Sequence, residues 1–187
     1  MSRARYIAQA GVIAAVYATL TLITMQFLGG LAWGPIQLRV SEAFTVIALV
    51  TPAAVPGLTI GSVVANALNP TAVWPLAAFD VVFGSLGTLL GALWMRHFRR
   101  NLPLALAGPV IANALIVPAY LPLLLKGLGF YTLPLIGVNL EGAWFPMYLF
   151  GVVTIGIGEG IVVYALGWPL ALALKRMGIA DVSDSKG

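Results

Sequence analysis

Residues 1–30 read MSRARYIAQAGVIAAVYATLTLITMQFLGG and place a long apolar run directly behind Arg3 and Arg5. Such a basic start is typical of a signal peptide. The run is longer than the roughly 7–15 residues of a signal-peptide core, however, and no A-x-A cleavage site follows it. A helix needs about 20 apolar residues to cross the roughly 30 Å hydrocarbon core of a bilayer. We therefore expect a retained membrane helix over residues 5–28.

The rest of the chain is equally apolar. Of its 187 residues, 60% are hydrophobic and 9% charged, and the mean hydropathy is +0.99. Soluble domains carry roughly 25% charged residues. The apolar runs are continuous instead of alternating with polar residues, which favours helices over strands. The sequence predicts an all-α integral membrane protein with a single membrane domain over 1–187, including a polar tail at 179–187.

Six helical segments account for the apolar runs. They are expected approximately over residues 5–28, 40–51, 54–68, 75–96, 103–125 and 143–174. The second and third segments are short for a membrane span, and Pro52 and Pro56 break the helix between them. They form either two short tilted spans or one re-entrant pair. We favour two spans, because only an even total gives matching basic ends.

The basic residues gather where these segments end. With six transmembrane helices, most of them face the cytoplasm, as the positive-inside rule predicts. Both termini are then cytoplasmic, while Arg39 and Lys126 lie on the other side. The residues expected on the cytoplasmic side are Arg3, Arg5, Arg96, His97, Arg99, Arg100, Lys175, Arg176 and Lys186.

A few polar residues stand inside apolar segments, where an ionisable group costs about 3 kcal/mol or more. They are Arg39, Glu42, Asn66, Asp80, Asn113 and Glu159. In the six-helix topology, five helices bring these groups to the middle and outer half of one bundle. Buried polar groups need partners, so their convergence predicts a pocket that opens to the outside. Three carboxylates with only Arg39 to balance them would suit a cationic ligand with several hydrogen-bond donors.

A purely structural interpretation is open for each residue taken alone. Arg39 and Glu42 are three positions apart and can pair with each other. Asn66 and Asn113 can hold helices together, as polar residues often do in membranes. Small residues at 10, 14 and 18 form a stripe, Ala10, Ala14 and Ala18, that permits close helix packing, within the chain or against another subunit.

Several functions are disfavoured. The chain has no G-x-x-x-x-G-K-[ST] loop for ATP and no cysteine, and its only histidine, His97, lies far along the chain from the carboxylates, so we expect no metal site. An intramembrane aspartic enzyme built from Asp80 with Glu42 or Glu159 is an alternative, because paired carboxylates can share a proton. We predict that the protein is not an enzyme.

Five ordered motifs give the chain a family resemblance over roughly residues 5–175. They are QLRVSEAFT at 37–45, AVPGLTIG at 54–61 with Ala65 and Asn66, FDVVFGSLGTLL at 79–90, IAN at 111–113 and GIGE at 156–159. With these motifs the chain resembles the QueT family, substrate-binding S-components of energy-coupling factor (ECF) transporters. The resemblance implies a six-helix bundle in the plasma membrane of a prokaryote. It also implies a partner membrane subunit and two cytoplasmic ATPases that hydrolyse ATP, with no cofactor on this chain. Ala10, Ala14 and Ala18 match the stripe through which S-components dock on the membrane subunit.

The resemblance further implies a queuosine precursor as substrate, chiefly preQ1 (7-aminomethyl-7-deazaguanine). Glu42 and Asp80 are then the leading acids for its N–H donors and its cationic aminomethyl group, with Glu159 third. Asn66 and Asn113 would read the mixed donor–acceptor edge, and Arg39 would orient Glu42 or contact the carbonyl oxygen. Trp33 is the expected lid. Two rivals share most of these features: an S-component for another flat cationic vitamin, and a stand-alone carrier driven by ion gradients.

Overall fold

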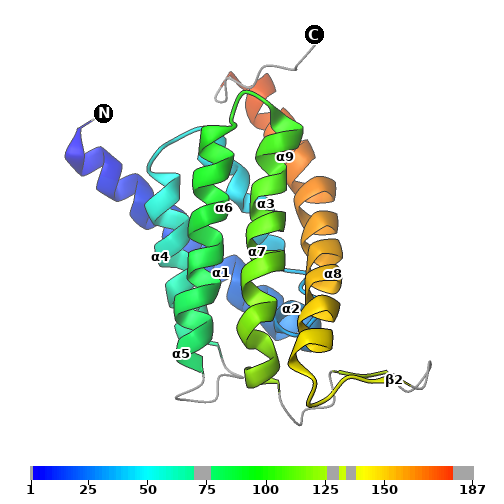
Figure 1. Cartoon of the computed structure of the whole chain (residues 1–187). Helices are drawn as coiled ribbons and strands as arrows, with labels where there is room; N and C mark the ends of the chain where they lie inside the picture. The colour runs from blue at the N-terminus through cyan, green and yellow to red at the C-terminus, as the bar shows by residue number, and fades with distance from the viewer. Residues whose placement is uncertain (1, 70–76, 126–130, 134–137, 179–187) are drawn as a thin grey trace.

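The computed structural model describes residues 2–69, 77–125, 131–133 and 138–178, which are mostly helical (Figure 1). Helix α1 (Arg3–Leu28) starts behind Ser2, whose hydroxyl accepts a hydrogen bond from Arg5 N at 3.3 Å and so caps the helix. It ends at Gly29, where φ is 51°. A one-turn helix, α2 (Gly30–Trp33), follows.

The second and third segments are short helices with a clear break between them. Helix α3 (Val40–Ala43) continues as a 3₁₀ helix, η1 (Phe44–Leu49), and the chain then turns into α4 (Ala54–Ala67). Pro56 lies in the first turn of α4, where the missing N–H would have had no helical partner in any case. The prolines therefore shape the break as expected, but most of the segment at 40–49 is 3₁₀ helix where a regular α-helix was predicted.

Two of the longer helices contain a π-helical turn. Helices α5 (Ala77–Phe79) and α6 (Ser85–His97) are joined by the π turn η2 (Asp80–Gly84). Helices α8 (Trp144–Val162) and α9 (Trp168–Arg176) are joined by the π turn η4 (Val163–Gly167). Helix α7 (Leu102–Leu124) lies between them in sequence. Single π turns within α-helices are frequent at functional sites, and η2 begins at Asp80.

Four helices of the described chain are long and apolar enough to cross a membrane. They cover Arg3–Leu28, Ala77–His97, Leu102–Leu124 and Trp144–Arg176, whereas Val40–Leu49 and Ala54–Ala67 are apolar but shorter. The all-helical membrane fold is thus as predicted. The two short helices account for the remainder of the six predicted segments, and their crossing of the membrane stays a prediction.

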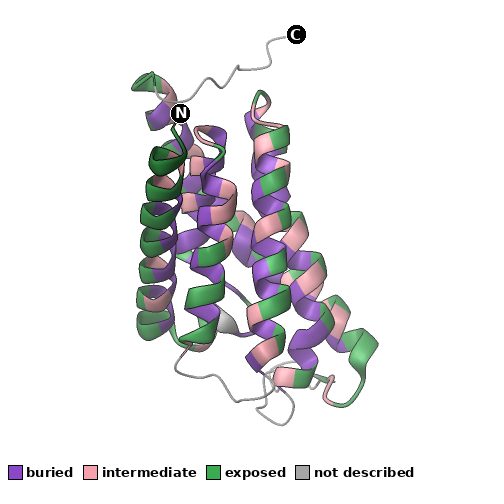
Figure 2. Ribbon diagram, turned by 90° about the vertical axis from the view of Figure 1, so that its left-hand side faces the viewer, coloured by how far each residue is buried: buried purple, intermediate pink, exposed green. Residues whose placement is uncertain are grey.

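The helices pack in a simple order. Helix α1 lies against α4, α6 lies between α4 and α7, and α7 lies against α8. In Figure 1, α6, α7 and α8 run side by side while α1 crosses behind them. Buried residues line the inner faces of the helices and exposed residues their outer faces (Figure 2). Large side chains on the outer faces are apolar, as lipid contact requires.

The two ends of the bundle differ. The start of α1, the turn from α6 to α7 and the end of α9 share one end, shown at the top of Figure 1. The other end carries a small antiparallel hairpin of β1 (Thr132–Leu133) and β2 (Val138–Asn139). The sequence predicts basic residues where several helical segments begin or end. Those that the structure describes therefore meet at one end of the bundle. Which side of the membrane that end faces remains a prediction.

Candidate functional site

A group of polar side chains is buried inside the helix bundle, between two apolar clusters. One cluster contains Tyr17, Leu58 and Met95, and the other contains Tyr120 and Tyr131. The buried polar side chains are Thr21, Thr24, Gln37, Arg39, Ser41, Glu42, Thr45, Ser62, Asn66, Asp80, Ser85, Thr88, Asn113 and Glu159. This group includes six of the seven residues that the sequence predicts for a binding site.

Glu42 is held at the start of a hydrogen-bonded chain. The Tyr17 hydroxyl, from α1, donates to Glu42 Oε1 and lies 3.5 Å from Thr88 Oγ1 on α6. Thr88 in turn donates to Ser62 Oγ on α4 at 3.1 Å. Four helices therefore meet at one polar chain, and Tyr17 fixes the position of the Glu42 carboxyl group.

The same chain continues to Asp80. Asn66 Nδ2 lies 3.4 Å from Ser62 Oγ and donates to the backbone oxygen of Asp80 at 3.1 Å. The Tyr120 hydroxyl, from α7, donates to Asp80 Oδ1 at 2.7 Å. A Cβ atom at Gly84 would lie about 3 Å from all three side chains, at 3.0 Å from Asn66 Nδ2 and Asp80 Oδ1 and 3.1 Å from the Tyr120 hydroxyl. The π turn η2 and its glycine thus allow Asp80 to enter the bundle.

The third carboxylate, Glu159 on α8, is paired with α7. Asn113 Nδ2 donates to Glu159 Oε1 at 3.2 Å. The oxygen of the same amide, Asn113 Oδ1, lies where a Cβ atom at Gly87 would be placed. Gly87 directly precedes Thr88, a member of the polar chain. The Glu159 carboxyl group also interacts electrostatically with Glu42 and Arg39. The two halves of the polar group therefore form a single site.

Arg39 is buried, with only 4% of its surface exposed, and its Nε donates to the backbone oxygen of Ala32 at 3.1 Å. Asp80 and Glu42 both lie close enough to interact electrostatically with its charge. Local pairing of Arg39 with Glu42 therefore does not account for all of its charge interactions. The guanidinium instead balances several acids of the site at once.

The segment before α3 is pressed against α8. The Thr154 hydroxyl donates to the backbone oxygen of Pro35 at 2.6 Å. A Cβ atom at Gly158 would lie 2.5 Å from the backbone oxygen of Gln37. This close approach buries the Gln37 side chain, which is 1% exposed, beside the helix that carries Glu159.

Several atoms of the site are buried without a hydrogen-bond partner among the residues that the structure describes. They are Gln37 Nε2, Glu42 Oε2, Asn66 Oδ1, Ser85 Oγ and Glu159 Oε2. Leaving a buried polar atom unpaired costs about 1–3 kcal/mol, and more for a charged group. The part of the chain that the structure describes buries three carboxylic acids against one guanidinium. Such a site is suited to a ligand that supplies hydrogen-bond donors and positive charge.

The aromatic residues near the hairpin end are described only in part. Trp33 ends helix α2, but its side chain lies outside the described part of the structure, as do Trp74 and Phe130 altogether. Tyr131 is fully buried and packs in the same apolar cluster as Tyr120. Tyr131 therefore shares an apolar cluster with the tyrosine that binds Asp80, while the lid role of Trp33 stays a prediction.

The alanine stripe of α1 packs against another helix of the same chain. Ala10, Ala14 and Ala18 are buried, and Cβ atoms at Gly57 and Gly61 would lie 2.8 Å from Ala10 O and 2.7 Å from Ala14 O. The stripe therefore allows α1 to pack closely on α4, which is the first of the two predicted roles, helix packing within the chain. Docking of another subunit through these same alanines would require α1 to leave α4. The small residues exposed on α1 are Ala4, Ala8, Gly11, Ala15 and Thr19.

Sequence reasoning missed several contributors, among them Tyr17, Tyr120, Gln37 and Thr88. A single hydroxyl or amide side chain in an apolar segment is a weak indication of a binding site, because a membrane span can accommodate one such residue. A tyrosine in the middle of a span is a usable signal, since tyrosine in membranes prefers the interface and needs a partner when buried. Among the described residues, no three His, Cys, Asp or Glu side chains are grouped to hold a metal ion.

The fold and the buried polar group together define a helical membrane protein that carries a cluster of polar side chains inside its bundle. The chain belongs to the QueT transporter family, whose model matches residues 7–176. It is accordingly a membrane-embedded transport protein and not an enzyme. No curated protein and no solved structure matches the chain.

Proposed function

We propose that this protein is the substrate-binding S-component of an ECF transporter and that it binds a queuosine precursor, preQ1 or a close relative, from outside the cell. The unpartnered buried oxygens of Glu42, Glu159 and Asn66 are the observation that carries the proposal. Family membership supports transport of a small molecule, and the chemistry of the site supports this class of substrate.

The substrate has complementary groups. The guanine-like face of preQ1 presents N–H and NH₂ donors, which a carboxylate can accept in bidentate fashion. Its aminomethyl group is cationic near neutral pH and requires a second acid. Glu42 and Glu159 each have one oxygen already bound and one oxygen available. Gln37 Nε2 is a buried donor that can bind the ring carbonyl oxygen.

Asp80 and Asn66 form the second part of the proposed site. Tyr120 holds one oxygen of Asp80, and Asn66 Oδ1 is an unpartnered acceptor near it. Arg39 interacts with all three acids, so its positive charge offsets part of the repulsion among them before the substrate arrives. When a cationic substrate binds, its positive charge reduces the repulsion among the acids of the site.

Energy for uptake would come from partner proteins, a membrane subunit and two ATPases in the plasma membrane of a prokaryote. A partner helix can approach α1 on exposed small residues such as Gly11, Ala15 and Thr19. A groove of about 480 Å³ lies between the start of α1 and η1, and Arg5, Ala8 and Phe44 are among the residues that line it. This face, instead of the buried alanines, is our proposed docking surface.

Binding of preQ1 to the purified protein, followed by tryptophan fluorescence, tests the proposal. Saturable binding of preQ1, but not of guanine or thiamine, is expected. Glu42→Gln and Asp80→Asn should weaken binding at least tenfold, because each removes a charge that faces the ligand. Folded variants that bind preQ1 as tightly as the natural protein would refute the assignment of the site.

Uptake in cells separates the proposed S-component from a stand-alone carrier. We expect accumulation of preQ1 only when the ECF membrane subunit and ATPases are present. Uptake that persists without them would show a carrier driven by an ion gradient. Binding of another flat cationic vitamin, with preQ1 ignored, would keep the fold and the transporter class but replace the substrate.

A further inference from the structure

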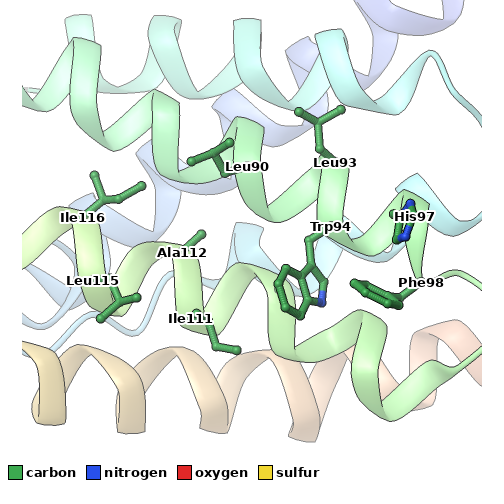
Figure 3. Close-up of a pocket in the computed structure, with 10 residues that line it drawn as sticks. Leu90, Leu93, Trp94, His97, Phe98, Ile111, Ala112, Leu115 and Ile116 are labelled. Carbon is green, nitrogen blue, oxygen red and sulfur yellow. The ribbon is translucent and has the colours of Figure 1, made fainter.

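We propose that the groove between α6 and α7 is a binding site for an anionic phospholipid, with one acyl chain in the groove and the headgroup at the basic turn that joins the two helices. This site is separate from the buried polar group and does not depend on the substrate. The groove has a volume of about 660 Å³ and is open to the surroundings of the bundle (Figure 3).

The groove has the shape and polarity for a hydrocarbon chain. Its floor includes the small residues Gly108 and Ala112 of α7. Its walls include Leu90 and Leu93 of α6 and Leu115 of α7, which are 44%, 47% and 49% exposed. Both helices are candidate membrane spans, so this apolar surface faces lipid tails.

An aromatic wall closes the groove near the basic turn. Trp94 reaches from α6 towards α7, and its Nε1 donates to the backbone oxygen of Leu104 at 2.8 Å (Figure 3). The indole lies over Gly108, where a Cβ atom would be 2.6 Å from Trp94 Cγ. The ring of Phe98 lies next to it at a centroid distance of 4.9 Å and is tilted by 49°. Trp94 is therefore fixed across the groove, one turn before the basic end of α6, and tryptophan is enriched at membrane interfaces.

Positive charge lies directly beyond this wall. Helix α6 ends at His97, the turn after it carries Arg99 and Arg100, and the sequence between Asp80 and Glu141 contains no acidic residue. Arg96 is directed elsewhere, since its Nη1 donates to the backbone oxygens of Ala48 and Leu49. Basic pockets between membrane helices on the cytoplasmic side bind anionic headgroups. The charge thus selects an anionic lipid over a neutral one.

The test uses brominated lipids, which quench tryptophan fluorescence on contact. Trp94 becomes the single reporter when the other tryptophans are changed to phenylalanine: Trp33, Trp74, Trp144 and Trp168. In vesicles of phosphatidylcholine, brominated phosphatidylglycerol should quench Trp94 at a several-fold lower mole fraction than brominated phosphatidylcholine. Equal quenching by the two lipids would overturn the proposal.

Two pairs of variants separate charge from shape. Arg99→Gln with Arg100→Gln should abolish the preference for phosphatidylglycerol, whereas Arg3→Gln with Arg176→Gln, at the same end of the bundle, should leave it intact. Ala112→Phe should fill the groove and reduce quenching by both lipids, whereas Val153→Phe on the exposed face of α8 should not. If the preference for phosphatidylglycerol survived both in the Arg99→Gln, Arg100→Gln variant and in Ala112→Phe, the assignment would be wrong. A helix of another subunit would then be the better candidate for the groove.

A second measurement keeps the test independent of the tryptophan replacements. The protein with all its tryptophans is extracted in mild detergent, and the retained lipid is identified by mass spectrometry. Phosphatidylglycerol should be enriched over its share of the membrane and should fall to that share in the Arg99→Gln, Arg100→Gln and Ala112→Phe variants. Retained lipid that matches the membrane composition in the unaltered protein would refute the proposal.

Discussion

Gly158 and Gly160 lie two positions apart on α8 but have different surroundings. A Cβ atom at Gly158 would lie 2.5 Å from the backbone oxygen of Gln37, whereas at Gly160 it would meet nothing within 4 Å. Gly158→Ala should therefore push the segment before α3 away from α8 and displace Gln37 and Arg39. Overpacking of this kind costs about 1–3 kcal/mol.

Thermal unfolding in detergent and preQ1 titration check this pair of substitutions. Gly158→Ala should lower the melting temperature and weaken binding, while Gly160→Ala should be neutral or slightly stabilising, because alanine favours helix over glycine by about 1 kcal/mol. If the two variants behaved alike, the close contact between Gln37 and α8 would be wrong.

The charged members of the site and its two asparagines, Asn66 and Asn113, could be predicted from sequence, whereas the other neutral members could not. Glu42, Asp80 and Glu159 stand out because a carboxylate inside an apolar segment is costly. Gln37 precedes its segment and reads as an ordinary loop residue, and Tyr17 reads as one of many large residues in α1. Their burial depends on which helices meet, which a single sequence does not state. The unpartnered atoms, on which the proposed function depends, are visible only in the structure.

The contact between α1 and α4 determines where Tyr17 is placed. A Cβ atom at Gly61 would lie 2.7 Å from Ala14 O and 3.0 Å from Tyr17 Cβ. Gly61→Ala should therefore move α1 outward and loosen the hydrogen bond from Tyr17 to Glu42. Gly11, on the exposed side of α1, has nothing within 4 Å and supplies the matched control.

We expect Gly61→Ala to lower stability by about 1–3 kcal/mol and to weaken substrate binding, with Gly11→Ala close to the unaltered protein. The measurements are thermal unfolding and preQ1 titration on both variants. A Gly61→Ala protein that kept full stability and full affinity would show that α1 and α4 are packed less tightly than described here.

The helical elements follow from the apolar runs, but their internal irregularities do not. Pro52 and Pro56 predict the break before α4, and the basic residues predict the helix ends. The 3₁₀ helix at Phe44–Leu49 and the π turn at Asp80–Gly84 have no comparable signal, because they depend on packing against neighbours. Since η2 sets the direction of Asp80, this irregularity is part of the site.

The complete absence of cysteine permits a direct test of the predicted topology of the whole molecule. Single cysteines at Ser2, Asn101 and Lys175 probe the end that carries the basic residues, and one at Asn139 probes the hairpin. A membrane-impermeant maleimide should label Asn139→Cys in intact cells and the other three only after the membrane is opened. Labelling of the Ser2 and Asn101 positions on opposite sides would contradict an even number of crossings between them.

The central claim is that the buried acids are kept for a ligand, at a cost to the empty protein. Glu159→Gln tests it most directly, because the variant retains the size of the side chain and removes the charge. A carboxylate with one unpartnered buried oxygen destabilises the empty protein. Each kcal/mol regained should raise the melting temperature by about 2–4 °C in a chain of this length.

The measurement is the melting temperature of the unaltered protein and of Glu159→Gln, each with and without saturating preQ1. We predict that Glu159→Gln melts higher than the unaltered protein when empty and gains little or nothing from preQ1, whereas the unaltered protein is strongly stabilised by it. A Glu159→Gln protein that melts lower when empty and is stabilised by preQ1 as much as the unaltered protein would contradict the account, since Glu159 would then be a structural residue.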